Sequence, residues 1–142
     1  MKTANNSFER TVPNRSLLTV LLIFGAASLL HFVHNAEFLA DYPHMPASWA
    51  RADVYVAWVA LTTIGAVGWF LETRGYRFAG LIVLTAYAML GLDSLGHYLL
   101  APLSHHTLGM NVTILLEVTA AGLVLVEILR QFSHRIRWRA EQ

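Results

Sequence analysis

Four long apolar segments alternate with short polar segments along the 142-residue chain. A helix needs roughly 20 mostly apolar residues to cross the hydrocarbon core of a bilayer, and each segment meets that length. The connectors are short, so successive helices should run antiparallel. The pattern predicts an all-α integral membrane protein, a single domain over 1–142 folded as an up-down bundle of four transmembrane helices. The predicted spans are residues 17–39, 49–71, 78–100 and 108–129.

Polar residues and prolines mark the ends of these spans. Ser16 and Ser48 precede the first and second apolar segments, and serine is a favoured N-cap. Pro43 and Pro46 lie between these segments, where two prolines so close together cannot continue a helix. Pro102 closes the third span. The connector 40–51 is therefore predicted to be an ordered or interfacial loop, able to cover the end of the bundle.

The composition agrees with a membrane location. Hydrophobic residues make up 56% of the chain and charged residues 13%, whereas a soluble domain has about 25% charged residues. The chain has no cysteine, which excludes disulfides, thiolate metal sites and iron–sulfur clusters. Metal ligands would have to be His, Asp or Glu. A formal charge of only +1 gives no reason to expect a nucleic-acid partner.

The positive charges predict an orientation. Of the ten Lys and Arg residues, only Arg51 falls on the side opposite the termini. By the positive-inside rule both termini should be cytoplasmic, and a bacterial cytoplasmic (inner) membrane is the expected location. The segment 130–142 is basic and contains aromatic residues. This tail is expected either to lie on an anionic membrane surface or to be solvated.

Ionisable residues concentrate at the end of the spans away from the termini. Residues three or four apart share a helix face, which pairs His31 with His34, His34 with Glu37, and Asp93 with His97. Each such group costs at least ~2.5 kcal/mol inside the bilayer unless it is paired. Because these ionisable residues lie at a similar depth, we look for a single explanation for all of them. The set is His31, His34, Glu37, Asp93, His97 and Glu117.

A transition-metal ion is the preferred explanation, because a cation neutralises buried carboxylates and helix bundles build such sites from facing helices. Zinc, iron or manganese fits this ligand set best, with copper as an alternative. Glu37 and His31 are the expected acid–base residues beside the metal. The predicted ligands are His34, Asp93, His97 and Glu117, with His31 as a further ligand.

The leading hypothesis is a small membrane metalloprotein, with or without enzymatic activity, acting on a lipid-soluble or small substrate. A b-type haem protein, with His31 or His34 and His97 as axial ligands, is an alternative. A metal-free acid–base enzyme or proton-coupled carrier is another, as is an accessory subunit of a larger complex. The polar residues could also serve structure alone by hydrogen-bonding to one another. The expected partners are membrane lipid and, beyond it, a homo-oligomer or a larger membrane complex.

Three residues near the predicted site remain ambiguous. Asp53 is expected to stabilise the first turn of the second helix, since acidic side chains are favoured at helix N-termini. His105 and His106 lie in the connector after the third span, above the predicted site. Either histidine could bind the metal or a substrate, although a loop histidine needs no special explanation.

Overall fold

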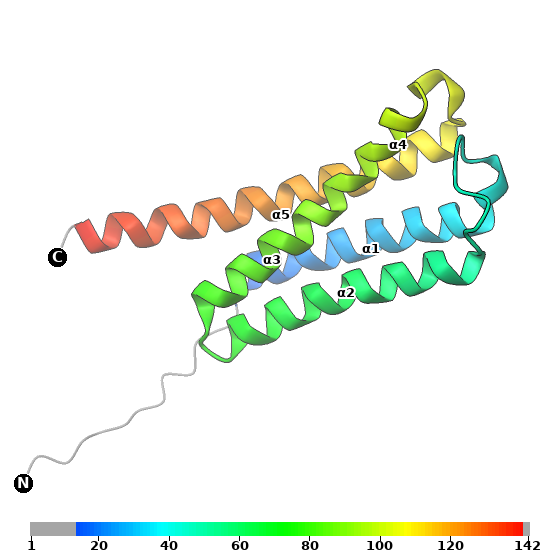
Figure 1. Ribbon diagram of the computed structural model, residues 1–142. Coiled ribbons are helices and arrows are strands. Elements are labelled where there is room, and N and C mark those ends of the chain that lie inside the picture. Colours follow the sequence, from blue (N-terminus) through cyan, green and yellow to red (C-terminus); the bar gives the residue numbers. More distant parts are fainter. Residues whose placement is uncertain (1–13, 141–142) are drawn as a thin grey trace, which may run out of the picture.

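The computed structural model describes residues 14–140, with side chains through residue 133. Every regular element in this part of the chain is helical, and four helices are long and apolar enough to cross a membrane. The third of them is interrupted by a short 3₁₀ turn, η2. Figure 1 shows the four running side by side. They are α1 (Arg15–Glu37), α2 (Arg51–Thr73), α3 with η2 and α4 (Arg77–Leu92, Asp93–Leu95, Gly96–Leu100), and α5 (Leu108–Ala140).

The helices form a four-cornered bundle in which each one runs opposite to the next (Figure 1). Helix α1 packs against α5 and α2, while α3 packs against α2 and α5. Two further 3₁₀ turns, η1 (Leu39–Asp41) and η3 (Leu103–His105), lie in the connectors at the end away from the termini. This topology brings the last turns of α1, the η2–α4 region and the first turns of α5 to the same end.

Two helices begin at other residues than the sequence predicts. Asn14, and not Ser16, is the N-cap of α1, and its Oδ1 accepts a hydrogen bond from the Leu17 N–H at 3.3 Å. Helix α2 begins at Arg51, beyond Ser48. The Asp53 carboxylate accepts the Ala50 N–H at 2.9 Å, which is the first-turn role expected for Asp53. Apart from the C-terminal end of the fourth helix, the spans were predictable to within about two residues, the usual uncertainty of helix ends.

Helix α5 is longer than its predicted span. It continues without interruption to Ala140, so most of the segment 130–142 is an extension of the fourth helix (Figure 1). The predicted membrane-surface contacts of this tail lie outside the described side chains.

The turn between α2 and α3 is short because a glycine ends the helix. Gly75 has φ of 89°, a conformation that costs other residues energy. Its N–H bonds the Glu72 carbonyl at 3.2 Å, and the Tyr76 N–H bonds the Leu71 carbonyl at 3.0 Å. This pair of bonds is a Schellman motif, which satisfies the last carbonyls of α2 and turns the chain directly into α3.

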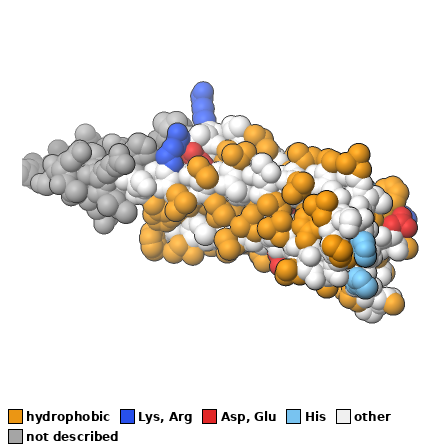
Figure 2. Space-filling view, turned by 90° about the horizontal axis from the view of Figure 1, so that it is seen from above, with side chains coloured by type: hydrophobic (Ala, Val, Ile, Leu, Met, Phe, Trp, Pro, Cys, Tyr) orange, Lys and Arg blue, Asp and Glu red, His pale blue; other side chains and the backbone are white. Residues whose placement is uncertain are grey.

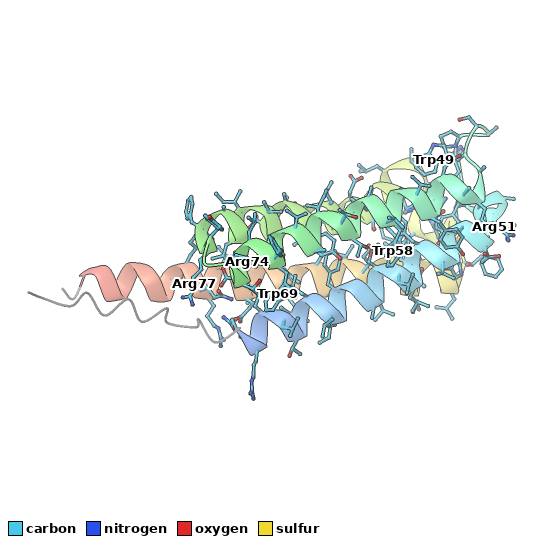
Figure 3. All side chains as sticks on the ribbon, turned by 90° about the horizontal axis from the view of Figure 1, so that it is seen from below. Trp49, Arg51, Trp58, Trp69, Arg74 and Arg77 are labelled. Carbon is cyan, nitrogen blue, oxygen red and sulfur yellow. The ribbon has the colours of Figure 1, made fainter. Side chains whose placement is uncertain are left out.

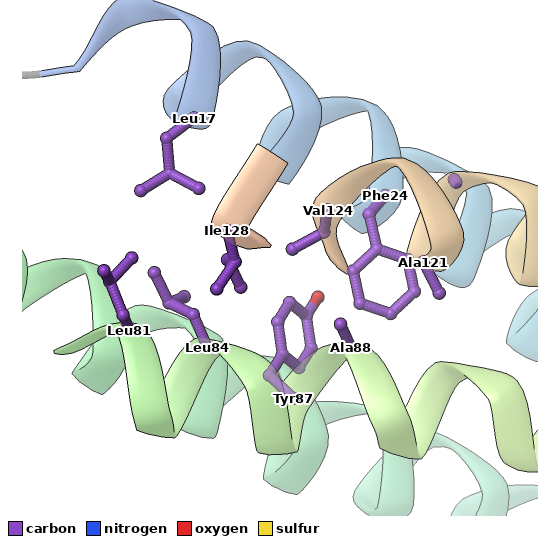
Figure 4. Packing of buried hydrophobic residues seen from close by; sticks show 10 residues of the cluster. Leu17, Phe24, Leu81, Leu84, Tyr87, Ala88, Ala121, Val124 and Ile128 are labelled. Carbon is purple, nitrogen blue, oxygen red and sulfur yellow. The ribbon is translucent and has the colours of Figure 1, made fainter. Parts of the chain in front are cut away.

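Apolar side chains fill the bundle in the half nearer the termini (Figure 4). Phe24 from α1 packs on Tyr87 from α3 with ring centroids 4.6 Å apart, and Val124 and Ile128 close the layer from α5. Gly91 permits this contact, because a Cβ there would lie 2.5 Å from Phe24 Cε2. The core fixes the relative positions of the three helices that carry the polar site.

The outer surface is also largely apolar, as expected for contact with lipid. Large exposed apolar side chains occur on every span, including Leu22, Val56, Phe78 and Leu129. Figure 2 shows hydrophobic atoms along the length of the bundle, arginines toward one end and histidines at the other. Figure 3 shows Trp49 and Arg51 at one end of α2 and Trp69, Arg74 and Arg77 at its opposite end. Such end positions suit tryptophan at a membrane–water interface.

Candidate functional site

A buried polar cluster occupies the interior of the bundle at the end away from the termini. Its parts come from α1, the η1 connector, the η2–α4 region, the η3 connector and α5. In α5, Glu117 is nine residues beyond Leu108, or about 14 Å along the helix at 1.5 Å per residue. The cluster therefore reaches well inside the bundle. Its buried polar members are Ser28, His31, Asn35, Tyr42, His106, Thr113 and Glu117.

His31 and Glu117 form the centre of the cluster. His31 Nε2 lies 3.7 Å from Glu117 Oε2, and the two side chains are only 2% and 1% exposed. The Ser94 hydroxyl donates to the same carboxyl oxygen at 2.5 Å. Within the described residues, Glu117 has no Lys or Arg partner. Any positive charge beside this carboxyl group must therefore come from a proton on His31.

The hydrogen bonds around Thr113 fix the imidazole tautomer. The Thr113 hydroxyl donates to the Met110 carbonyl at 3.1 Å, so its oxygen is left to accept. His31 Nδ1 lies 3.3 Å from that oxygen and must carry a hydrogen to bond with it. In the neutral imidazole, Nε2 then presents a lone pair toward Glu117. The two side chains face each other at ion-pair distance, and a modest shortening of this contact would allow them to exchange one proton.

Tyr42 extends the cluster toward the end of the bundle. Its hydroxyl lies 3.0 Å from His34 Nδ1 and is hydrogen-bonded to Thr113. Burial raises the pKa of Tyr42 to about 12, because the phenolate would lose its hydration, and the nearby Glu117 carboxyl adds to this effect. Tyr42 is thus a neutral hydrogen-bonding link. It connects the buried His31–Glu117 pair with the half-buried His34.

A second buried glutamate on the same helix provides a contrast. Glu127, ten positions after Glu117, is 8% exposed, and its Oε2 lies 3.1 Å from Arg130 Nε. Ser16 and Gln131 also hydrogen-bond to Glu127. Glu127 therefore has a permanent cation and several hydrogen-bond donors. Glu117 has a titratable partner, which makes it the one of these two acids suited to proton exchange.

Three more rings, those of His97, His106 and Tyr98, continue the cluster from His31 and Tyr42. The His97 ring lies 5.4 Å from His31, 5.1 Å from Tyr42 and 6.3 Å from His106, measured between centroids. The His106 ring is 5.3 Å from Tyr98. His31, Tyr42, His97, His106 and Tyr98 form a continuous cluster of polar rings. We call these five residues the ring cluster.

Two buried hydrogen-bonding atoms of the polar cluster have no partner among the described residues. His106 Nδ1 must donate to the Pro102 carbonyl, 3.2 Å away, which leaves Nε2 as an acceptor in the neutral ring. That Nε2 atom is buried and unpaired, as is Asn35 Oδ1, which lies one turn beyond His31 on α1. A buried polar atom without a partner costs about 1–3 kcal/mol. Both atoms are therefore available to a ligand.

Glu37 lies apart from the predicted site. Its carboxylate accepts the Tyr55 hydroxyl at 2.9 Å and pairs with Arg51 at 3.3 Å, at an exposed edge between α1 and α2. Six residues separate it from His31, so the two side chains diverge by about 120° around the helix. Its predicted acid–base partnership with His31 is not formed. His31 itself occupies the centre of the site.

The predicted metal ligands are not assembled. Among the described residues, no group of three or more His, Asp and Glu side chains could hold a metal ion. Asp93 lies in the η2 turn and is exposed, and no hydrogen bond or ion pair joins it to His97 in the described part of the chain. His34 faces Tyr42, while Glu117 faces His31 and Ser94. The structure thus gives no support to the predicted centre of His34, Asp93, His97, Glu117 and His31.

The haem alternative, with His31 or His34 and His97 as axial ligands, stays a prediction, and the ring nitrogens of His31 and His34 have these surroundings. Both ring nitrogens of His31 face protein groups, Thr113 and Glu117, and its ring is in edge contact with His97. His34 uses Nδ1 for Tyr42, and its Nε2 lies 2.8 Å from where a Cβ on Gly109 would be. An axial ligand needs a ring nitrogen that is free to approach iron.

Several members of the site had only weak signals in the sequence. Tyr42 belongs to a connector predicted to cover the end of the bundle, and it is 3% exposed inside the cluster. His106 is buried, whereas its neighbour His105 is exposed. Ser94 reaches Glu117 only because η2 turns it inward. Partners of this kind depend on tertiary packing and leave no pattern in the chain.

Comparison with known proteins adds no assignment. No protein-family model matches the chain, and neither a curated protein nor a solved structure is significantly similar to it.

Proposed function

We propose that the protein is a membrane-embedded acid–base protein whose buried His31–Glu117 pair exchanges a proton with a small or lipid-soluble molecule. The observation that carries this proposal is the pairing of a buried carboxyl group with a histidine, which is its only prospective cation among the described residues. Ionisable groups at such depth are costly, and they are typical of proton relays and substrate sites in membrane proteins.

The surroundings of the pair support proton exchange. Thr113, Tyr42 and His34 continue the hydrogen-bonded path from His31 toward the end of the bundle. Hydroxyl and imidazole groups both donate and accept, so each can pass a proton to the next. A reaction at His31 would therefore exchange its proton through this path. In a membrane oriented by the positive-inside rule, the path opens on the side opposite the termini.

The proposal predicts one titration step that both side chains share. With the protein in lipid nanodiscs, the carboxyl ¹³C signal of Glu117 and the imidazole ¹⁵N signals of His31 should change over the same pH interval. Glu117→Gln should remove that step from the His31 signals. Glu127→Gln is the matched control, because it removes a buried carboxyl group from the same helix and should leave the His31 step in place.

Metal analysis of the same samples separates this proposal from a metalloprotein. Independent titration of the two side chains would overturn the acid–base site. A stoichiometric metal ion that is lost in His31→Ala would also overturn it, and would restore the metal centre as the explanation. A normal His31 step in Glu117→Gln would show that the carboxyl group is not the proton partner.

A further inference from the structure

The proposed acid–base site lacks a partner for its hydrogen-bond acceptors. His106 Nε2 and Asn35 Oδ1 are buried and unpaired, and neutral His31 directs a lone pair toward Glu117. Every one of these atoms accepts a hydrogen bond. Among the described residues at this end, no Lys or Arg supplies donors to them. A ligand that satisfied these atoms would have to carry the hydrogens itself.

The formal charge of this end favours a cation. The segments 31–60 and 90–117 contain five carboxyl groups and a single arginine. The arginine, Arg51, is already paired with Glu37. With the carboxyl groups ionised and the histidines neutral, the sum is five negative charges less one positive, or −4. The acidic residues are Glu37, Asp41, Asp53, Asp93 and Glu117.

The ring cluster adds surfaces that attract a cation. The rings of Tyr42 and Tyr98 lie next to those of His97 and His106, respectively, at centroid distances of 5.1 and 5.3 Å. Aromatic faces attract ammonium groups, and more strongly where water is excluded. The apolar exterior around this end, including Leu95 and Leu99, lets a hydrocarbon chain remain in lipid. A ligand with a cationic head and an apolar tail matches both the ring cluster and the apolar exterior.

We infer that the site binds an amphiphilic amine, with its ammonium N–H groups donating to His106 Nε2 of the ring cluster and to Asn35 Oδ1 of α1. This inference rests on the proposed acid–base function, because the bound ammonium group would be the proton donor presented to His31 and Glu117. It adds the chemical class of the ligand. The N–H groups distinguish this class from a quaternary ammonium, and the positive charge distinguishes it from an alcohol.

Four probes built on a six-carbon chain test the inference on the unmodified protein in phosphatidylcholine nanodiscs. Hexylamine should bind saturably and shift the ¹⁵N signal of His106 Nε2. Hexyltrimethylammonium lacks N–H donors and loses both hydrogen bonds, so it should bind more than about ten-fold more weakly. Hexanol, which lacks the charge, should bind roughly ten-fold more weakly, the size of one lost hydrogen bond to a charged group. Hexanoate should not bind. Equal affinity for hexanol and hexylamine, or preference for hexanoate, would overturn the inference.

Variants locate the bound amine. His106→Phe and Asn35→Leu each remove one free acceptor and should each weaken hexylamine binding roughly ten-fold. His105→Phe is the matched control, because His105 is the exposed neighbour, and should bind normally. Normal binding by both site variants would refute the assignment. The two proposals fail separately, because the shared His31–Glu117 titration is measured without a ligand and the order of probe affinities does not depend on it.

Discussion

Gly91→Ala tests the helix packing that positions the site. A methyl group at this position would lie 2.5 Å from Phe24 Cε2 and 3.1 Å from the Cβ of Ala121. Both distances are shorter than a normal carbon–carbon contact of about 3.5–4.0 Å. Phe24 is 1% exposed and its ring packs on Tyr87, so it has no free space to move into. Helices α1, α3 and α5 would have to separate.

The expected effect follows from two opposing terms. Overpacking a tight core costs up to about 3 kcal/mol, and replacing glycine by alanine within a helix returns about 1 kcal/mol. Gly91→Ala should therefore lower the free energy of unfolding by about 2 kcal/mol. Gly25→Ala is the matched control, because no atom outside its own helix lies within 4 Å of the new Cβ. That variant should be unchanged or more stable by up to about 1 kcal/mol.

Reversible unfolding in mixed micelles, by titration with sodium dodecyl sulfate, measures both variants. Adding Phe24→Leu to Gly91→Ala should recover part of the loss, because leucine vacates the space that the methyl group needs. If Gly91→Ala and Gly25→Ala had the same stability, or if Phe24→Leu gave no recovery, the close contact of α1 with α3 at Gly91 would be refuted.

Three other predictions concern single positions. The pKa of Tyr42 is raised to about 12 from 10.0, so the unfolded chain loses the phenol proton at lower pH than the folded protein does. The stability that this shift contributes is complete below pH 10 and is lost as the pH rises toward 12. In thermal unfolding, Tyr42→Phe should lessen this loss, whereas Tyr76→Phe, at an exposed position, should not. Gly109→Ala would place a methyl group 2.8 Å from His34 Nε2 and should shift the His34 ¹⁵N signals, and unchanged signals would contradict the contact. Gly75→Ala should cost about 1 kcal/mol in unfolding measurements, because φ is 89° there.

The four spans could be predicted because hydropathy over about 20 residues is a strong signal. The interruption at η2 could not, since the sequence around Asp93 continues the apolar helical pattern. That interruption changes which residues meet. It turns Asp93 outward and Ser94 toward Glu117, where an unbroken helix was expected to pair Asp93 with His97.

The depth of the polar site could also be inferred, because the topology brings the ends of several helices together. Its pairings required tertiary information. Glu37 contacts two side chains of α2, Tyr55 and Arg51. The sequence of α1 alone does not predict either contact. His31 and Glu117 were both recognised as candidates, but their direct opposition depends on how α1 and α5 are rotated against each other.

The adjacency of Asp93 and Ser94 links the interior to the outer surface. Ser94 donates a hydrogen bond to the carboxyl group of Glu117, and Asp93, the preceding residue in the same short turn, is exposed on the outside of the bundle. A 3₁₀ turn has weaker hydrogen bonding than the helices on either side and is the part of the span most easily displaced. Any rearrangement of Ser94 on protonation of Glu117 would therefore move an exposed acidic group. A neighbouring molecule in contact with Asp93 would then respond to the protonation state of the buried site.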